Sequence, residues 1–281
     1  MLYALIAAGA AAVIAALIII LIFPSTRRHP DRNLMDGRAI AHRGLHKIEE
    51  GIPENSLAAF RKAAEAGLMI ENDVHLTADG NVVVFHDDTL DRMCGVPGKP
   101  EEKTLEELKA LKLAGTDETI PTLRECLEAA DGRVPFLIEY KVSGNNGAEL
   151  CEAAEKVLSE FDVEYAIQSF YPGVLIWYKK NRPERMRGQL ATVIRGYGFV
   201  KGLLGTLVSN VATRPDFISY EHAHARYFFR RMTRVLGAFQ AGWTFRSPEE
   251  LGKNGKYFRA FIFENMPPET VEKYIEERFS K

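Results

Sequence analysis

After residue 38, short apolar runs alternate with stretches in which apolar residues recur every three or four positions. Runs rich in β-branched and aromatic residues predict strands, and the wider spacing predicts amphipathic helices. The predicted strands cover residues 39–44, 69–76, 82–85, 136–141, 165–170, 187–192, 217–220, 238–244 and 261–264. The predicted helices cover residues 56–66, 105–111, 122–130, 148–160, 173–180, 199–208, 225–236, 248–251 and 268–279.

Eight of these strands are expected to be parallel. The run at 82–85 follows 69–76 too closely to be its parallel neighbour, because a parallel crossover needs a dozen or more residues. It is therefore the returning arm of a β-hairpin with its turn at residues 77–80. The other strands, each followed by a helix, predict an α/β fold, a (β/α)8 TIM barrel with a hairpin and loop insertion after strand 2. An open doubly wound sheet would need a glycine-rich phosphate loop where His42-Arg43-Gly44 stands.

The first segment differs from the rest of the chain. Residues 2–23 carry no charge, and they are long enough for one helix to cross a bilayer. No Lys or Arg precedes them, unlike the start of a secretory signal, whereas four arginines follow within residues 27–38. This charge bias predicts a cytoplasmic location for the downstream domain. We expect an N-terminal transmembrane anchor over residues 1–24, a linker over 25–37 and the barrel over 38–281, and cleavage of the first segment stays open.

Composition narrows the function only a little. The net charge of −2 does not suggest nucleic-acid binding. The three cysteines, Cys94, Cys126 and Cys151, show no CxxC spacing and are expected to be free thiols, which suits a reducing compartment. The oligomeric state is not predicted.

The hairpin carries two carboxylates and a histidine that could form a functional site. Glu71 and Asp73 lie two positions apart, so both point to one face of their strand. Two carboxylates on one face repel each other unless a cation lies between them. The hairpin brings His86 back opposite Glu71, within a residue or two of register. The simpler alternative, a solvated surface hairpin, fits poorly with the apolar residues on both arms.

In a TIM barrel the functional site lies at the C-terminal ends of the strands. Several polar or aromatic residues stand at or near such ends: His42, Glu71, Asp73, Glu139, Lys141, Ser169 and Trp243. Three carboxylates favour Mg²⁺ or Ca²⁺, and zinc is less expected because no second His or Cys stands at zinc spacing. Each residue also has a plainer interpretation, such as a structural histidine or a simple Glu139–Lys141 ion pair.

Together these groups indicate phosphodiester cleavage. A divalent cation with Arg43 and Lys141 suits a phosphate substrate. His42 and His86 suit a displacement in which one takes a proton and the other donates one. The sequence leaves open whether water attacks directly or a substrate hydroxyl attacks first, through a cyclic phosphate.

The motifs that carry these residues resemble the glycerophosphodiester phosphodiesterases, in that family's order from Ala39 to about Asn265. They are His42-Arg43-Gly44, Pro53-Glu54-Asn55-Ser56, Glu71-Asn72-Asp73-Val74, Leu76-Thr77-Ala78-Asp79-Gly80, Val84-Phe85-His86-Asp87, Thr89-Leu90-Asp91-Arg92, Ile120-Pro121-Thr122-Leu123, Glu139-Tyr140-Lys141, Ser169-Phe170 and Trp243-Thr244.

The resemblance implies a metal held by Glu71, Asp73 and Glu139, with His42 and His86 as the catalytic acid–base pair. It also implies that Arg43 and Lys141 lie near the phosphate, that Asn55 supports the site and that Trp243 packs against substrate. The chain departs from the family in having Phe263-Glu264-Asn265 where a Thr-Asp pair near a proline is usual. This departure concerns the substrate more than the metal site.

The expected function is therefore metal-dependent hydrolysis of glycerophosphodiesters to an alcohol and glycerol 3-phosphate by a membrane-anchored enzyme. A lysophospholipase D-type activity, which releases the head group from lysophospholipids, is the first alternative. A catalytically silent barrel that binds lipid or protein is the second. The segments 195–207 and 227–231 are apolar or aromatic beside basic residues, and they suit either a lipid interface or ordinary barrel helices.

Overall fold

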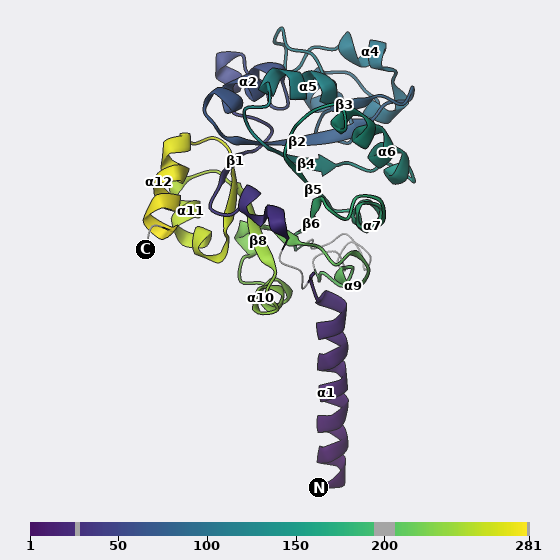
Figure 1. Cartoon of the computed structure of the whole chain (residues 1–281), viewed down its shortest axis with the longest axis vertical. Coiled ribbons are helices and arrows are strands. Elements are labelled where there is room, and N and C mark those ends of the chain that lie inside the picture. The colour runs from purple at the N-terminus through teal and green to yellow at the C-terminus, as the bar shows by residue number, and fades with distance from the viewer. Residues whose placement is uncertain (26–28, 194–205, 280–281) are drawn as a thin grey trace.

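The computed structural model describes residues 1–25, 29–193 and 206–279, and within them a closed β-barrel surrounded by helices (Figure 1). Eight parallel strands form the barrel, and the first pairs with both the second and the last. They are β1 (Ala39–Ala41), β2 (Met69–Leu76), β4 (Phe136–Tyr140), β5 (Tyr165–Ser169), β6 (Met186–Ala191), β7 (Phe217–Glu221), β8 (Phe239–Phe245) and β9 (Ala260–Phe263). The predicted TIM barrel is confirmed.

The predicted hairpin is also confirmed. The short strand β3 (Val82–Val84) pairs antiparallel with the outer end of β2, with Val74 opposite Val84. The Phe85 amide then donates to the Asp73 carbonyl over 2.9 Å, which places His86 one residue from Glu71 in register. The chain beyond β3 has its own small apolar core around Phe85, Met93 and Leu108. It includes the helices α3 (Asp91–Cys94) and α4 (Leu105–Lys109).

The helices lie outside the barrel, and several of them begin at a residue whose side chain caps the helix. Ser56 accepts from the Ala59 amide at the start of one helix, and Thr122 forms a capping box with Glu125 at the start of another. These surrounding helices are α2 (Leu57–Glu65), α5 (Leu123–Ala130), α6 (Gly147–Leu158), α7 (Pro172–Asn181), α9 (Asn210–Thr213), α10 (Phe228–Val235), α11 (Pro248–Asn254) and α12 (Pro268–Phe279).

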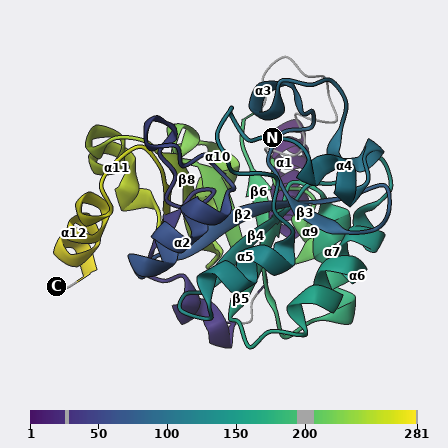
Figure 2. The ribbon, with the colours of Figure 1, turned by 90° about the horizontal axis from the view of Figure 1, so that it is seen from above.

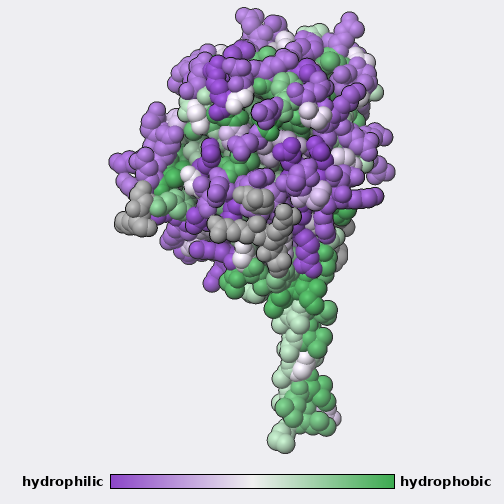
Figure 3. Space-filling model, viewed as in Figure 1, coloured by the Kyte–Doolittle hydropathy of each residue, from purple (hydrophilic) through white to green (hydrophobic). Residues whose placement is uncertain are grey.

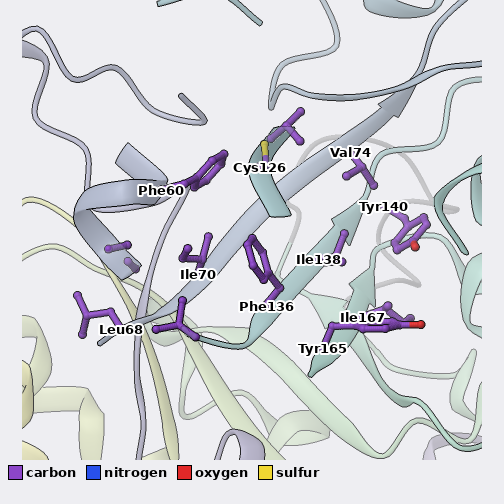
Figure 4. Close-up of a cluster of buried hydrophobic side chains, with 14 of the residues drawn as sticks. Phe60, Leu68, Ile70, Val74, Cys126, Phe136, Ile138, Tyr140, Tyr165 and Ile167 are labelled. Atoms are coloured by element: carbon purple, nitrogen blue, oxygen red, sulfur yellow. The ribbon is translucent and has the colours of Figure 1, made fainter. Parts of the chain in front are cut away.

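Two apolar layers hold the fold together. The larger layer lies between strands and helices, where Phe60, Phe136 and Ile138 are fully buried (Figure 4). The smaller fills the inside of the barrel, where Phe217 packs over Gly188 so closely that a Cβ there would lie 2.1 Å from the ring. The barrel interior is therefore packed at this level, and a cavity opens nearer the strand C-termini.

Two expectations need correction. The polar stretch expected to be a linker contains the 3₁₀ helix η1 (Pro30–Leu34), and Leu34 and Met35 are buried in the core inside the barrel. The segment is held by these two apolar side chains and by the ion pair of Asp36 with Arg259. The helix predicted over 225–236 is shorter, because 3₁₀ helix η4 (His222–His224) and three further residues precede α10. Most of the predicted helix 199–208 lies outside the described residues.

Helix α1 (Leu2–Ile22) projects away from the domain (Figure 1), and Figure 2 shows it end-on. Its side chains are exposed and apolar along nearly its whole length, whereas the face of the domain seen in Figure 3 is mostly hydrophilic. Its last residue, Ile22, is fully buried against α9, where Asn210 donates to the Ile22 carbonyl over 2.9 Å. Such a helix suits a membrane span, and an N-terminal signal sequence has the same character.

The junction of α1 with the domain lies on a flank of the barrel. Arg214 donates to the Phe23 carbonyl over 2.7 Å, and the Ser25 amide donates to the Pro215 carbonyl over 3.0 Å. These partners precede β7, at its N-terminal end. α1 therefore leaves the domain beside α9, away from the strand C-termini where a TIM barrel carries its site.

Candidate active site

A small cavity of about 100 Å³ opens at the C-terminal ends of the strands. Seven of the residues selected from the sequence line it: His42, Arg43, Glu71, His86, Glu139, Lys141 and Trp243. Asp73 and Asn55 lie behind this lining and are almost completely buried. Ser169 does not reach the cavity: its side chain points outward and donates to the Tyr140 carbonyl. The preceding residue, Gln168, occupies the inward position instead, because alternate residues of a strand face opposite sides.

The turn after β1 adopts a conformation that brings its backbone to the site. Arg43 has a φ of 55° and Gly44 a φ of 78°. A Cβ on Gly44 would lie 2.9 Å from the backbone of Ala59, so glycine alone fits this approach to α2. The turn aims the Arg43 amide at Glu71 Oε2, 3.0 Å away. The backbone geometry of this turn thus supplies one fixed donor to a carboxylate.

Three carboxylates meet below that turn. Glu71, Asp73 and Glu139 each place an oxygen within 4.8 Å of the others, and all three are buried. Burial, together with the charges of Asp73 and Glu139, raises the pKa of Glu71 well above its ordinary value. Burial also raises the pKa of Glu139. Carboxylates that repel each other in a buried site are stabilised by a cation between them, so this set fits a hard divalent metal ion.

Two cationic side chains lie on the same cluster. Lys141 pairs with Asp73 over 3.0 Å and also contacts Glu139. Burial alone would lower the pKa of Lys141, but the charges of Asp73 and Glu139 raise it. Arg43 lies 3.6 Å from Asp73, and Asn55 donates to the same carboxylate over 2.9 Å. Burial alone would raise the pKa of Asp73, but the charges around it, Lys141 first, hold it well below the usual range.

His42 is fixed by a residue that the sequence reasoning did not select. Its Nδ1 contacts Glu264, which also accepts from Arg246 Nε over 2.7 Å. Burial lowers the pKa of His42 to about 4, more than Glu264 raises it. The other ring nitrogen, Nε2, is therefore available to a ligand in the cavity that His42 lines. The sequence held a usable signal, because a closed barrel pairs its first and last strands: Ala41 opposes Phe263, so the next residues, His42 and Glu264, become neighbours.

His86 belongs to a second, more open group. Its Nδ1 lies 2.7 Å from Asp87, and its side chain is 32% exposed. Glu54, His86 and Asp87 are close enough together to share a metal ion. However, Arg92 pairs with both acids over 2.6 Å. These acids already have cationic partners, so the buried cluster is the better metal site.

One wall of the cavity is aromatic. Trp243 meets Phe170 edge to face, with ring centroids 5.8 Å apart. The indole nitrogen of Trp243 is buried and has no hydrogen-bond partner within the described part of the chain. Leu190 and Ile262 complete this side. The site thus joins a charged half to an apolar half, an arrangement suited to a substrate with a phosphate and an organic group.

Comparisons with known proteins agree with this geometry. A model of the Glycerophosphoryl diester phosphodiesterase family matches residues 42–192. A glycerophosphodiester phosphodiesterase of Caldanaerobacter subterraneus subsp. tengcongensis is 42% identical over 135 residues, 45% of this chain and 52% of that protein. A lysophospholipase D of Rattus norvegicus is 34% identical over 139 residues, 45% of this chain and 43% of that protein.

The fold extends the similarity beyond the matched half. An Oleispira antarctica phosphodiesterase, solved with the product sn-glycerol-3-phosphate, superposes with a TM-score of 0.68 and 25% identity, covering 85% of this chain and 96% of that one. The chain spans about half the length of the curated relatives it matches. The matched residues 42–192 contain both histidines and all three clustered carboxylates. On the match to the family and the shared barrel, the chain belongs to the glycerophosphoryl diester phosphodiesterase family.

Proposed function

We propose that this protein hydrolyses glycerophosphodiesters to an alcohol and glycerol 3-phosphate. One observation carries the proposal: three mutually close, buried carboxylates share one cavity with two histidines and two cationic side chains. Family membership supports it, and so does the glycerol 3-phosphate product bound to the Oleispira antarctica phosphodiesterase. A catalytically silent barrel would not need all of these carboxylates, histidines and cationic side chains at the C-terminal ends of its strands.

Glu71, Asp73 and Glu139 would hold one divalent cation, Mg²⁺ or Ca²⁺. When bound, it supplies charge neutralisation and polarises a phosphoryl oxygen. The donor set consists of oxygens alone, which is the preference of these two ions. Asn55 holds Asp73 in place through its 2.9 Å hydrogen bond and so acts as a positioning residue.

The two histidines divide the proton transfers. His42 is neutral at physiological pH because burial lowers its pKa, and Glu264 fixes its Nδ1. Its Nε2 is therefore the base that takes a proton from the attacking hydroxyl, whether that hydroxyl belongs to water or to the substrate. His86 is more open to solvent and is supported by Asp87. It donates a proton to the departing alkoxide oxygen.

The cationic and aromatic side chains bind the substrate. Arg43 and Lys141 offset the charge of the phosphate, and Arg246 extends this positive rim beyond Glu264. Trp243 and Phe170 cover the organic part of the substrate. The rat lysophospholipase D and this apolar wall favour lysophospholipids as the second candidate substrate.

α1 would anchor the enzyme in a membrane, with residues 1–24 as the anchor and the barrel beginning near residue 38 on the cytoplasmic side. The arginines that follow α1 support this orientation. The expected linker is partly folded into the barrel, so the domain is held directly against the end of α1. Labelling of the barrel thiols in intact cells tests the orientation. We expect no labelling unless the cells are permeabilised, and labelling without permeabilisation would show the opposite orientation.

A substrate panel tests the activity. The full chain in a neutral detergent is given glycerophosphocholine, glycerophosphoethanolamine and their single-chain lysolipid counterparts, and phosphorus NMR identifies the products. We expect glycerol 3-phosphate from the diesters. Release of the head group from lysolipids alone would favour the second candidate. No phosphorus product from any compound, with Mg²⁺ or with Ca²⁺, would contradict both.

A further inference from the structure

A second cavity lies beside α10, is lined by positive charges and shares no lining residue with the catalytic cavity. It has a volume of about 590 Å³ and is lined by Arg226, Arg230, Arg231, Arg234, Val235 and Tyr257. Acidic side chains do not contribute to this lining. In the described part of the chain, no carboxylate lies within 4.0 Å of the four guanidinium groups.

The central member, Arg230, is buried without an anionic partner. Its side chain is only 1% exposed. Its two hydrogen bonds, to Gln240 and to the Tyr257 carbonyl, are long at 3.5 and 3.3 Å, and its Nε has no partner. Buried charges in proteins are normally paired and hydrogen-bonded, because desolvation is costly. Arg230 lacks such a pair and lines the cavity, so an anion in the cavity would complete its environment.

The pKa values around Arg230 are consistent with the excess of arginines in this lining. Burial, followed by the neighbouring Arg234, lowers the pKa of Arg230 to about 10. A hydrogen bond from Arg226 lowers the pKa of the Tyr257 phenol. The Arg226 Nε lies 3.2 Å from that hydroxyl. The cavity therefore disfavours further cations and favours a bound anion.

The position of α10 indicates the source of the anion. α10 lies at the end of the domain from which α1 projects (Figure 1). Two large apolar side chains, Phe228 and Val235, are 58% and 80% exposed on the same helix. Exposed apolar residues beside arginines are typical of helices that lie in the head-group layer of a membrane. Arginine is also suited to two-point contacts with phosphate oxygens.

We infer that the Arg226–Arg234 cavity binds the phosphate of an anionic phospholipid in the membrane that α1 enters. The inference rests on the proposed anchoring by α1. Arg230 provides the buried contact, Arg231 and Arg234 close over the head group, and Phe228 and Val235 reach the acyl boundary. The barrel is thereby fixed at a second point besides α1.

The test uses the full chain in nanodiscs of phosphatidylcholine alone or with phosphatidic acid, a phosphomonoester that is not a diester substrate. Hydrogen–deuterium exchange is followed in peptides that cover residues 226–236. We expect exchange there to slow at least about fivefold when phosphatidic acid is present. The double variant Arg231→Gln, Arg234→Gln should lose this protection, and Arg231→Lys, Arg234→Lys should keep most of it.

A matched control removes two positive charges elsewhere. Lys156 on α6 and Lys273 on α12 are exposed, and Lys156→Gln, Lys273→Gln should keep the full protection. Inorganic phosphate added to phosphatidylcholine discs should give none. Equal exchange in both discs, protection that survives the arginine-to-glutamine change, or full protection by inorganic phosphate would each overturn the inference.

The same samples separate this inference from the proposed function. Hydrolysis of soluble glycerophosphocholine is measured in every disc, and it should stay at the wild-type rate whether or not α10 responds to lipid. Anchoring is read independently from co-elution of the protein with the discs. A missing response at α10 with normal hydrolysis and co-elution would overturn the lipid site alone.

Discussion

The barrel mouth and the outer face of α10 differ in the sign of their unpaired charge. At the mouth, Glu71, Asp73 and Glu139 crowd together, and Lys141 and Arg43 only partly offset them. At α10, arginines crowd together without an acid in the lining. A buried group of one sign calls for a ligand of the other. Under the two proposals above, the mouth would bind a cation and the flank an anion, so catalysis and attachment would use separate sites.

The largest effect is expected from the two histidines. His42→Ala and His86→Ala should each lower kcat by roughly 10²–10⁴-fold, because each removes one proton transfer. Steady-state kinetics on glycerophosphocholine measures this, and circular dichroism checks the fold. Near-native turnover in either variant would make that histidine structural.

A smaller loss is expected from Glu264→Gln. The change keeps the shape of the side chain but weakens a charge-assisted hydrogen bond to His42. At about 1.5–3 kcal/mol for such a bond, kcat should fall roughly 10–100-fold. Because Glu264 acts through His42 and not on the substrate, KM should change little. A rise in KM with unchanged kcat would instead place Glu264 in substrate binding.

The pH profile sharpens the role of His42. Its pKa is lowered to about 4, so the imidazole is neutral and able to accept a proton throughout the range above that value. The acid limb of kcat/KM should therefore fall near pH 4 and not near 6.5, the ordinary value for histidine. The profile is measured at saturating metal ion, because protonation of Glu71, whose pKa is raised, would otherwise release the metal. Under that condition an acid limb at 6.5 or above would contradict the assignment of His42 as the base.

The smallest effect is expected at α10. Arg231→Gln, Arg234→Gln should leave kcat/KM on soluble glycerophosphocholine within about twofold, because exposed substitutions far from a site rarely disturb it. The matched control is Lys156→Gln, Lys273→Gln. A large loss of kcat/KM in the arginine variant, but not in the lysine control, would show that the two regions are coupled and would contradict the separation of catalysis from attachment.

Much of the barrel could be predicted because its signals are local. Apolar runs and their spacing predicted most strands and helices, Ser56 marked the start of one helix, and the short turn after Leu76 excluded a parallel crossover. Carboxylates two residues apart on β2 necessarily share a face, so Glu71 and Asp73 could be paired from their spacing alone.

The features that escaped prediction depend on contacts distant in sequence. Glu264 meets His42 only because the barrel closes. Leu34 and Met35 lie in a basic stretch, and their burial depends on strand residues distant in sequence, such as Phe217 and Phe239. Ser169 was selected for its place near a strand end. Alternate residues of the strand face opposite sides, however, and it is Gln168 that faces the cavity.

The most direct test of the charge assignment is a cation titration at the mouth. Full-length protein stripped with EDTA is titrated with Mg²⁺ or Ca²⁺ by calorimetry, with hydrolysis of glycerophosphocholine followed in parallel. The variant Glu71→Gln is compared with Glu152→Gln, which removes an exposed acid on α6. We predict one bound cation and restored hydrolysis for the wild type and Glu152→Gln, and neither for Glu71→Gln. Full hydrolysis by the stripped wild type, or unchanged cation binding by Glu71→Gln, would contradict the account.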